Sequence, residues 1–186
     1  MDHKPHTHCH FCGKSLEEAI AFDGGLKCSL CKNTNWVNPT PVAVLIAHCG
    51  YSEYRDQHAV FAVRRGIEPF KGQLALPSGF IVSGESWQEA AVREANEEIG
   101  LHCRVNSPLE CPEHVLTEST PDKKIVLIVG HVQGVFYIED PFVPNREALE
   151  RVILTPDVSE QLCFPIHRKA LAMYWDERGV KHNIVV

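Results

Sequence analysis

Three glutamates lie at helical spacing near the middle of the chain. Glu97 and Glu98 follow Glu94 by three and four residues, and these two spacings place side chains on one face of an α-helix. Like-charged pairs at this spacing cost roughly 0.2–0.5 kcal/mol each on an exposed helix. A hard divalent cation relieves this repulsion, since Mg²⁺ takes oxygen ligands and keeps positions for substrate phosphates.

A cation held by these carboxylates could support the hydrolysis of a pyrophosphate bond. It would neutralise anhydride oxygens, position the substrate and lower the pKa of bound water, and a remaining carboxylate could accept a proton from that water. The other interpretation is a solvated acidic face, the ordinary role of a charge run on a helix. The three glutamates alone do not separate the two interpretations.

The element that must position the glutamates is a helix from about Ser86 to Ile99. Its start carries Ser86-x-x-Glu89, the pattern of a capping box, and Gly100 follows its end as a C-terminal cap. The neighbouring arc of the helix is apolar and can pack inward; it consists of Ala91, Val92, Ala95 and Ile99. Arg93, four residues from Glu89 and from Glu97, can offset part of the repulsion.

The residues around this helix resemble the Nudix box. That box is a glycine, five residues, a glutamate, seven residues and then Arg-Glu-apolar-x-Glu-Glu-x-Gly-apolar. The chain fills the fixed positions with Gly79, Glu85, Arg93, Glu94, Glu97, Glu98 and Gly100, and the apolar positions with Ala95 and Leu101. So many matches at fixed gaps are far more specific than a short glycine pattern. The motif occupies residues 72–101, and the order of elements resembles the family over roughly residues 40–180.

The resemblance implies a role for each residue of the box. Glu94, Glu97 and Glu98 would bind Mg²⁺ (or Mn²⁺), joined by the backbone carbonyl of Gly79. Arg93 would orient the glutamates through ion pairs, and Glu85 would be a hydrogen-bonding or outer-shell carboxylate.

The general base has no fixed place in this family. We expect it to be Glu97 or Glu98. Three glutamates outside the box are further candidates, although each is more ordinarily a solvated surface residue: Glu118, Glu147 and Glu150. Substrate-binding residues stay unassigned; Arg64 and Arg65 could meet phosphate oxygens or could form an exposed charged strand end.

Four cysteines near the N-terminus have the spacing of a zinc site. Cys9-x-x-Cys12 and Cys28-x-x-Cys31 offer four thiolates for a closed tetrahedral site, which leaves no position for water and is therefore structural. About 38 residues cannot easily fold on core packing alone, which gives zinc a physical role. The alternatives are unmetallated thiols, a redox pair, or a nearby histidine in place of one cysteine. The remaining cysteines are expected to be free thiols: Cys49, Cys103, Cys111 and Cys163.

The composition changes near residue 38, where we place a boundary between a zinc ribbon (1–38) and a Nudix domain (39–186). After the boundary, apolar and alternating runs predict strands over residues 42–47, 58–64, 74–76, 124–136 and 148–154. Gly130 and Gly134 would interrupt the fourth of these. A second helix is predicted over residues 164–178. This order predicts an α+β class, and the resemblance implies a mixed sheet with helices on both sides.

Charge and hydropathy restrict the class of partner. Apolar residues make up 44% of the chain, charged residues 23%, and the formal net charge is −6, so a general nucleic-acid or membrane binder is not expected. No apolar run is long enough to span a bilayer, and the N-terminus lacks the pattern of a signal peptide. We expect a cytoplasmic protein, and the resemblance implies a homodimer.

A zinc ribbon before a Nudix box looks like two groups of the family: NADH pyrophosphatases, and zinc-ribbon enzymes that act on ADP-ribose or FAD. The first group carries Ser-Gln-Pro-Trp-Pro-Phe-Pro-x-Ser soon after the box, which this chain lacks. We therefore expect Mg²⁺-dependent cleavage of ADP-ribose or a related dinucleotide, with release of AMP and a phosphorylated fragment. The alternatives are a non-catalytic nucleotide sensor whose ribbon binds nucleic acid or protein, a nucleoside triphosphate pyrophosphohydrolase, and an mRNA cap-removing enzyme.

Overall fold

The structure is a computed structural model that describes residues 7–22, 24–36, 38–54, 58–101, 115–119, 124–131 and 141–184. The chain divides into two compact units, one of Met1–Thr40 with Ser119–Ile125 and the other of Pro41–Glu118 with Val126–Val186. Within the described ranges no helix has the length and apolar character needed to cross a membrane. The predicted domain boundary at residue 38 stays a prediction.

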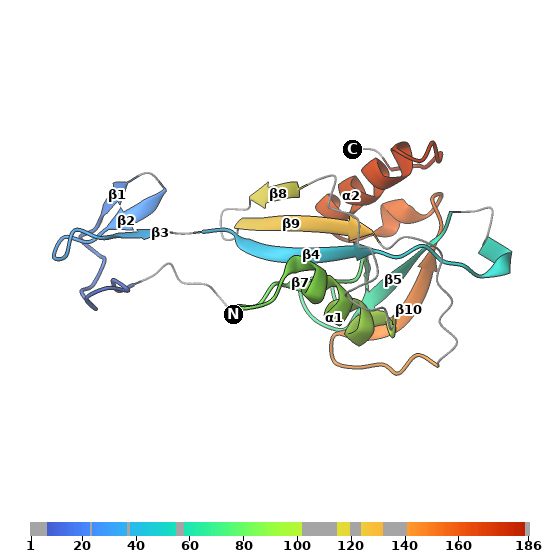
Figure 1. The fold of residues 1–186 in the computed structure, drawn as a ribbon, viewed down its shortest axis with the longest axis horizontal. Coiled ribbons are helices and arrows are strands. Elements are labelled where there is room, and N and C mark those ends of the chain that lie inside the picture. Colours follow the sequence, from blue (N-terminus) through green and yellow to red (C-terminus); the bar gives the residue numbers. More distant parts are fainter. Residues whose placement is uncertain are drawn as a thin grey trace. The chain divides into compact units, whose positions relative to one another are not determined.

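The N-terminal unit contains a small antiparallel sheet in the order β1-β2-β3, with strands β1 (Ile20–Phe22), β2 (Gly25–Lys27) and β3 (Thr34–Trp36) (Figure 1). Among its described residues, the buried hydrophobic cluster consists of Cys9, Leu16 and Cys28, with partly buried apolar neighbours. A core of this size gives little hydrophobic stabilisation, since each fully buried aliphatic side chain contributes only about 1.5–3 kcal/mol.

The described residues of the second unit form two sheets and two α-helices (Figure 1). One sheet has the order β10-β5-β6 and the other the order β7-β4-β9-β8. Their strands are β4 (Thr40–Ile46), β5 (Val60–Arg65), β6 (Leu74–Ala75), β7 (Ser78–Phe80), β8 (Val115–Ser119), β9 (Lys124–His131) and β10 (Ala148–Leu154). The helices are α1 (Trp87–Ile99) and α2 (Pro165–Asp176).

The apolar runs of the sequence form the core of this unit. Ala43 to Ile46 in β4 and Val60 to Val63 in β5 are fully or almost fully buried. Helix α1 packs against β7, β5 and β10, and α2 buries one side that includes Ile166, Leu171 and Trp175. Figure 1 shows α1 and α2 on opposite sides of the strands. The predicted α+β class is confirmed.

Most of the predicted elements are confirmed within one or two residues, namely β4, β5, β6, β10, α1 and α2. The predicted interruption at Gly130 is wrong, because this residue lies inside β9. A Cβ atom at Gly130 would stand 2.3 Å from the indole ring of Trp87, so the glycine makes room for the first turn of α1 and not for a turn in the strand. Position 134 lies outside the described residues.

Candidate active site and cysteine cluster

Helix α1 is fixed at both ends by caps. The amide of Glu89 donates to Ser86 Oγ at 3.2 Å, and the amide of Ser86 donates to Glu89 Oε2 at 2.8 Å, so both halves of the predicted capping box are present. Gly100 ends the helix with a left-handed φ of 70°. These local contacts decide where the acidic face begins and ends.

The apolar face of α1 decides how that face is oriented. Ala90, Ala91, Ala95 and Ile99 are all buried at or below 1% exposure. This packing also draws Glu94 and Glu98 inward, to 7% and 6% exposure, whereas the Glu97 side chain stays 55% exposed. The three predicted ligands therefore differ: two are buried and one lies at the surface.

The buried carboxylates contact the backbone of β7. The amide of Ser78 donates to Glu98 Oε2 at 2.9 Å. A Cβ atom on Gly79 would lie 1.8 Å from Glu94 Oε1, so Glu94 occupies space that a side chain at position 79 would fill. This placement of the Glu94 carboxylate thus requires glycine at position 79, because the carboxylate packs directly onto the backbone there. Sequence reasoning placed Gly79 at the site for its carbonyl oxygen and did not anticipate this contact.

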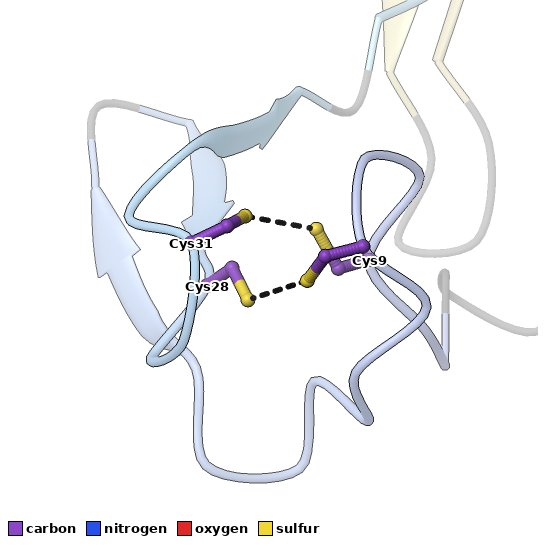
Figure 2. A group of neighbouring side chains, drawn as sticks. Cys9, Cys28 and Cys31 are labelled. Carbon is purple, nitrogen blue, oxygen red and sulfur yellow. Dashed lines mark hydrogen bonds between the residues drawn. The ribbon is translucent and has the colours of Figure 1, made fainter.

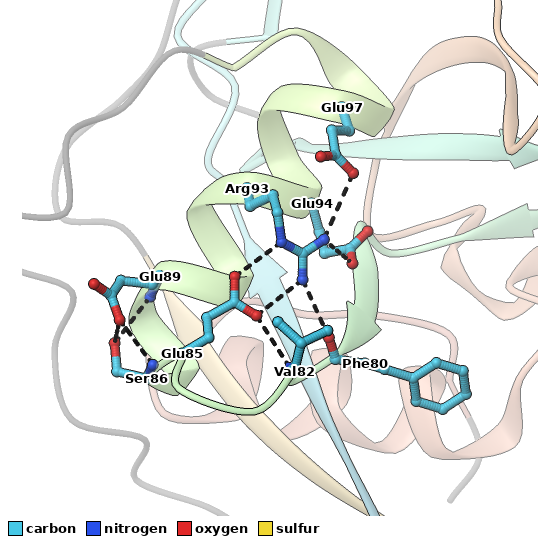
Figure 3. Close-up of polar contacts among 8 residues, drawn as sticks. All are labelled: Phe80, Val82, Glu85, Ser86, Glu89, Arg93, Glu94 and Glu97. Carbon is cyan, nitrogen blue, oxygen red and sulfur yellow. Dashed lines mark hydrogen bonds and ion pairs between the residues drawn. The ribbon is translucent and has the colours of Figure 1, made fainter.

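Arg93 forms ion pairs with three glutamates of the box, Glu85, Glu94 and Glu97 (Figure 3). Its Nε and Nη2 donate to the two carboxylate oxygens of Glu85 at 2.8 and 3.0 Å. Its Nη1 lies 2.5 Å from Glu94 Oε1 and 3.5 Å from Glu97 Oε2. Glu89, the other glutamate four residues away, instead receives hydrogen bonds from Ser86. Arg93 therefore links Glu85, at the start of the box, to the acidic face.

The protonation of the site follows from these contacts. Burial raises the pKa of Glu98 to about 8, against the lowering effect of the Ser78 amide. Burial also raises the pKa of Glu94, while Arg93 opposes that rise. Hydrogen bonds from Arg93 lower the pKa of Glu85. Two desolvated carboxylates in contact with the same short strand form an oxygen-donor set suited to a hard divalent cation, which would favour their ionised forms.

The glutamates do not converge as tightly as the cysteines do. In the described part of the chain, the cysteine quartet is the one group of three or more His, Cys, Asp or Glu whose ligand atoms lie together. The Glu97 carboxylate lies towards Arg93 (Figure 3), as expected where mutual repulsion is relieved by a neighbouring guanidinium. Its predicted role as a metal ligand stays a prediction.

Glu147 reaches the site from a distant part of the chain. Its negative charge contributes to the raised pKa of both Glu94 and Glu98. Asn145 anchors this segment: its Nδ2 donates to the carbonyl oxygen of Glu97 at 2.8 Å, and its Oδ1 accepts from the amides of Glu147 and Ala148 at 2.8 Å. Nothing in the local sequence marks Asn145, because its partner on α1 is 48 residues away.

The other candidates from the sequence are placed elsewhere or are not described. Glu150 pairs with Arg64 at 2.7 Å on the surface, and the side chain of Glu118 lies outside the described residues. Arg65 stands 4.9 Å from the centroid of the Phe164 ring, its Nε donates to Pro69 O at 3.0 Å, and its charge acts on Glu98. Of the two arginines, Arg65 is therefore the one whose charge acts on Glu98.

The four N-terminal cysteines converge as predicted. Their sulfur atoms all lie within 4.8 Å of one another, with Cys9 and Cys31 at 3.6 Å and Cys12 and Cys28 at 3.7 Å (Figure 2). Burial alone would raise the pKa of Cys9, but hydrogen bonds led by Asn35 Nδ2 lower it to about 6. Such a group of sulfur donors fits a tetrahedral zinc ion. Cys49 and Cys163 are buried free thiols, as expected, and positions 103 and 111 lie outside the described residues.

Two turns bring the cysteine pairs together. The amide of Gly13 donates to Cys9 O at 2.9 Å, and the amide of Lys32 donates to Cys28 O at 3.1 Å. Both residues directly follow the second cysteine of a pair, and both have a left-handed φ, 72° at Gly13 and 62° at Lys32. Glycine at position 13 suits this conformation, whereas nothing in the sequence marks Lys32, because non-glycine residues rarely adopt it.

Comparison with known proteins supports the interpretation of residues 79–101 as a Nudix box. A family model described as NUDIX domain matches residues 47–162. The ADP-ribose pyrophosphatase of Methanocaldococcus jannaschii is 40% identical over 81 residues, which are 44% of this chain and 43% of that protein. The aligned region therefore spans less than half the length of this relative.

Solved structures with a similar fold have low sequence identity. A NUDIX hydrolase from Nitrosomonas europaea has a TM-score of 0.61 at 20% identity, with 96% of each chain covered. The NUDIX domain of Shewanella oneidensis NrtR, complexed with ADP ribose, has a TM-score of 0.62 at 16% identity and covers 77% of this chain and 90% of that one. At such identities the likeness concerns the fold. The family match, which covers more than half of the chain and contains the whole box, shows that this protein belongs to the Nudix family.

Proposed function

We propose that the protein is a pyrophosphohydrolase that uses Mg²⁺ or Mn²⁺ to cleave a nucleoside diphosphate linked to another group, with ADP-ribose as the first candidate substrate and FAD and NAD(H) as further ones. The observation that carries this proposal is the buried pair Glu94 and Glu98, which contacts Gly79 and Ser78 of β7. Burying two like charges is costly unless a cation compensates them. The partial alignment with an ADP-ribose pyrophosphatase supports the choice of substrate.

Each residue of the box then has a role that its contacts support. Glu94 and Glu98 would hold the cation, with Glu97 and the Gly79 carbonyl as further ligands. Arg93 would keep Glu94 in place, and Glu85 would keep Arg93 in place, through the contacts described above. When bound, the divalent ion would neutralise the anhydride oxygens and lower the pKa of the attacking water.

The reaction needs one carboxylate that can exchange protons with water. The water oxygen forms a bond to one phosphorus of the anhydride, the bond from that phosphorus to the bridging oxygen breaks, and the water proton passes to the carboxylate. The bridging oxygen leaves with the other phosphate, so that ADP-ribose gives AMP and ribose 5-phosphate. Glu97 and Glu147 are exposed and lie near the buried pair, whereas Glu98 is buried. We therefore favour Glu97 or Glu147 as the general base.

The direct test is the substitution Glu98→Gln. The amide oxygen of glutamine can still accept from the Ser78 amide, so the fold should persist while the charge is lost. We expect turnover to fall by roughly 100-fold or more, since even outer-shell partners of a metal typically change activity 10- to 100-fold. The matched control is Glu89→Gln on the same helix, because glutamine is also compatible with a capping box.

The assay should compare Mg²⁺-dependent turnover of ADP-ribose, FAD, NADH and nucleoside triphosphates. Wild-type activity in Glu98→Gln would show that the cation is not held by this pair. Tight binding of ADP-ribose by the wild-type protein without turnover would identify the nucleotide sensor, and faster turnover of triphosphates would replace ADP-ribose as the substrate.

We also propose that the cysteine cluster binds a structural zinc ion. Four convergent sulfur donors support this role, as does the small hydrophobic cluster of three buried residues in the part of this unit that the structure describes. A homodimer and a cytoplasmic location remain predictions from the sequence and the family resemblance.

A further inference from the structure

A cavity of about 560 Å³ lies between the segment after β5 and the turn before β10. It is lined by Gly66, Ile67, Glu68, Lys71, Arg146 and Glu147. Its volume falls within the range of small-molecule sites. The lining residues that the structure describes all come from these two connecting segments, and none comes from α1 or α2.

The two segments that form the cavity are held together closely. The amide of Gly66 donates to Glu147 O at 2.6 Å, and a Cβ atom at Gly66 would stand 2.2 Å from Arg146 O. The first segment is closed by the amide of Gly72, which donates to Arg65 O at 2.8 Å. The second is anchored to α1 through Asn145. These backbone contacts hold the two walls of the cavity next to each other.

The cavity adjoins the acidic residues of the box. Glu147 lines it, and the charge of the same residue acts on Glu94 and Glu98. Asn145, two residues earlier, bonds to the carbonyl oxygen of Glu97. A substrate whose anhydride lies at the glutamates can therefore place one of its two phosphates, with the sugar attached to it, in this cavity.

The lining chemistry indicates which end of the substrate fits. Lys71 and Arg146 form no ion pair or side-chain hydrogen bond with any residue in the described ranges, so both cations can bind phosphate oxygens. Glu68 and Glu147 supply carboxylates, which accept hydrogen bonds from hydroxyl groups. No aromatic ring occurs among the described lining residues, and a purine base would lack a stacking partner there. Two cations beside two carboxylates suit a phosphorylated sugar.

We propose that this cavity is the subsite for the sugar phosphate on one side of the scissile bond. Lys71 and Arg146 would bind its phosphate, which is one of the two phosphates of the anhydride, and Glu68 would bind its hydroxyl groups. For ADP-ribose this group is ribose 5-phosphate, and its site is separate from the site of the adenosine. The inference rests on the proposed function in one respect, because that function supplies the anhydride. The chemistry of the residues that line the cavity does not depend on it.

The test is the direct binding of ribose 5-phosphate to the full chain by calorimetry, with inorganic phosphate and AMP as comparison ligands. Wild-type protein should bind ribose 5-phosphate more tightly than inorganic phosphate. Lys71→Gln and Arg146→Gln should each weaken the binding of ribose 5-phosphate by roughly fivefold, as expected for one partly exposed charged contact. Both variants should leave the affinity for AMP unchanged. Lys169→Gln, an exposed lysine of α2, is the matched control and should change neither ligand.

The outcomes separate this inference from the proposed function. Equal affinity for ribose 5-phosphate and inorganic phosphate, or an equal loss of AMP binding in the two variants, would overturn the subsite. Binding of ribose 5-phosphate without any turnover of ADP-ribose would support the subsite and overturn the hydrolase. Turnover of ADP-ribose with wild-type KM in both variants would support the hydrolase and overturn the subsite.

Discussion

Gly79→Ala tests whether the position of the Glu94 carboxylate controls activity. The new Cβ atom would stand 1.8 Å from Glu94 Oε1, 2.0 Å from Cδ and 2.6 Å from Oε2. Side-chain Cβ atoms essentially never approach another heavy atom closer than 3.0 Å, so the carboxylate must retreat by at least 1.2 Å. The carboxylate is the far end of a flexible side chain, and its retreat should leave the fold intact.

A retreat of this size is large compared with the tolerance of a magnesium site. Mg²⁺ binds oxygen ligands at about 2.0–2.1 Å in near-ideal octahedral geometry. A misplacement of about 1 Å can cost roughly 100-fold in rate, and we expect a loss of this order in kcat/KM for ADP-ribose. The variant should also need a higher Mg²⁺ concentration for half-maximal activity. The assay is turnover as a function of Mg²⁺, with a thermal melt of each protein.

The control for this experiment is Gly84→Ala in the loop before α1. Gly84 has a φ of 89°, and a Cβ atom there would meet nothing within 4 Å. This variant strains the backbone of the same motif without touching a carboxylate, so it should lose stability and keep its Mg²⁺ dependence. The reasoning is refuted if Gly79→Ala keeps wild-type turnover and Mg²⁺ dependence, or if Gly84→Ala loses as much activity as Gly79→Ala does.

Two further predictions concern pH and zinc. Burial lowers the pKa of His167 to about 3 from an ordinary 6.5, so the folded state keeps this ring neutral while the unfolded chain takes up a proton below pH 6.5. The resulting stability is present above pH 6.5 and is lost as the pH falls towards 3, by roughly 1 kcal/mol per pH unit. Chemical unfolding without added Mg²⁺ should show this slope in the wild-type protein relative to His167→Gln. Parallel curves of unfolding free energy against pH for the two proteins would contradict the assignment. Removal of zinc by a strong chelator should expose four additional reactive thiols and abolish the protection of the β1–β3 amides in hydrogen exchange. Unchanged protection of these amides in protein proven free of zinc would exclude a structural role for the metal.

The sequence was sufficient where neighbouring residues decide the structure. The caps of α1 at Ser86 and Gly100 and the convergence of the four cysteines both depend on contacts within a few residues or on fixed short spacings. The longer strands and both helices were predictable for the same reason, because hydrophobic periodicity is a local property. The strands β7 and β8 were missed: β7 has three residues, and the pairing of Gly79 with Ala43 that stabilises it joins residues far apart in sequence.

Tertiary structure decided how the predicted residues differ from one another. The sequence presents Glu94, Glu97 and Glu98 as equivalent members of one helix face, yet packing of α1 on β7 buries the first and third and leaves the second exposed. The arrival of Asn145 and Glu147 at the same site depends on a hydrogen bond across 48 residues. Chain entropy opposes such long-range contacts, and they form only because the whole core brings the segments together. The residue types therefore indicate the chemistry of the site, and the fold determines the role of each residue in that chemistry.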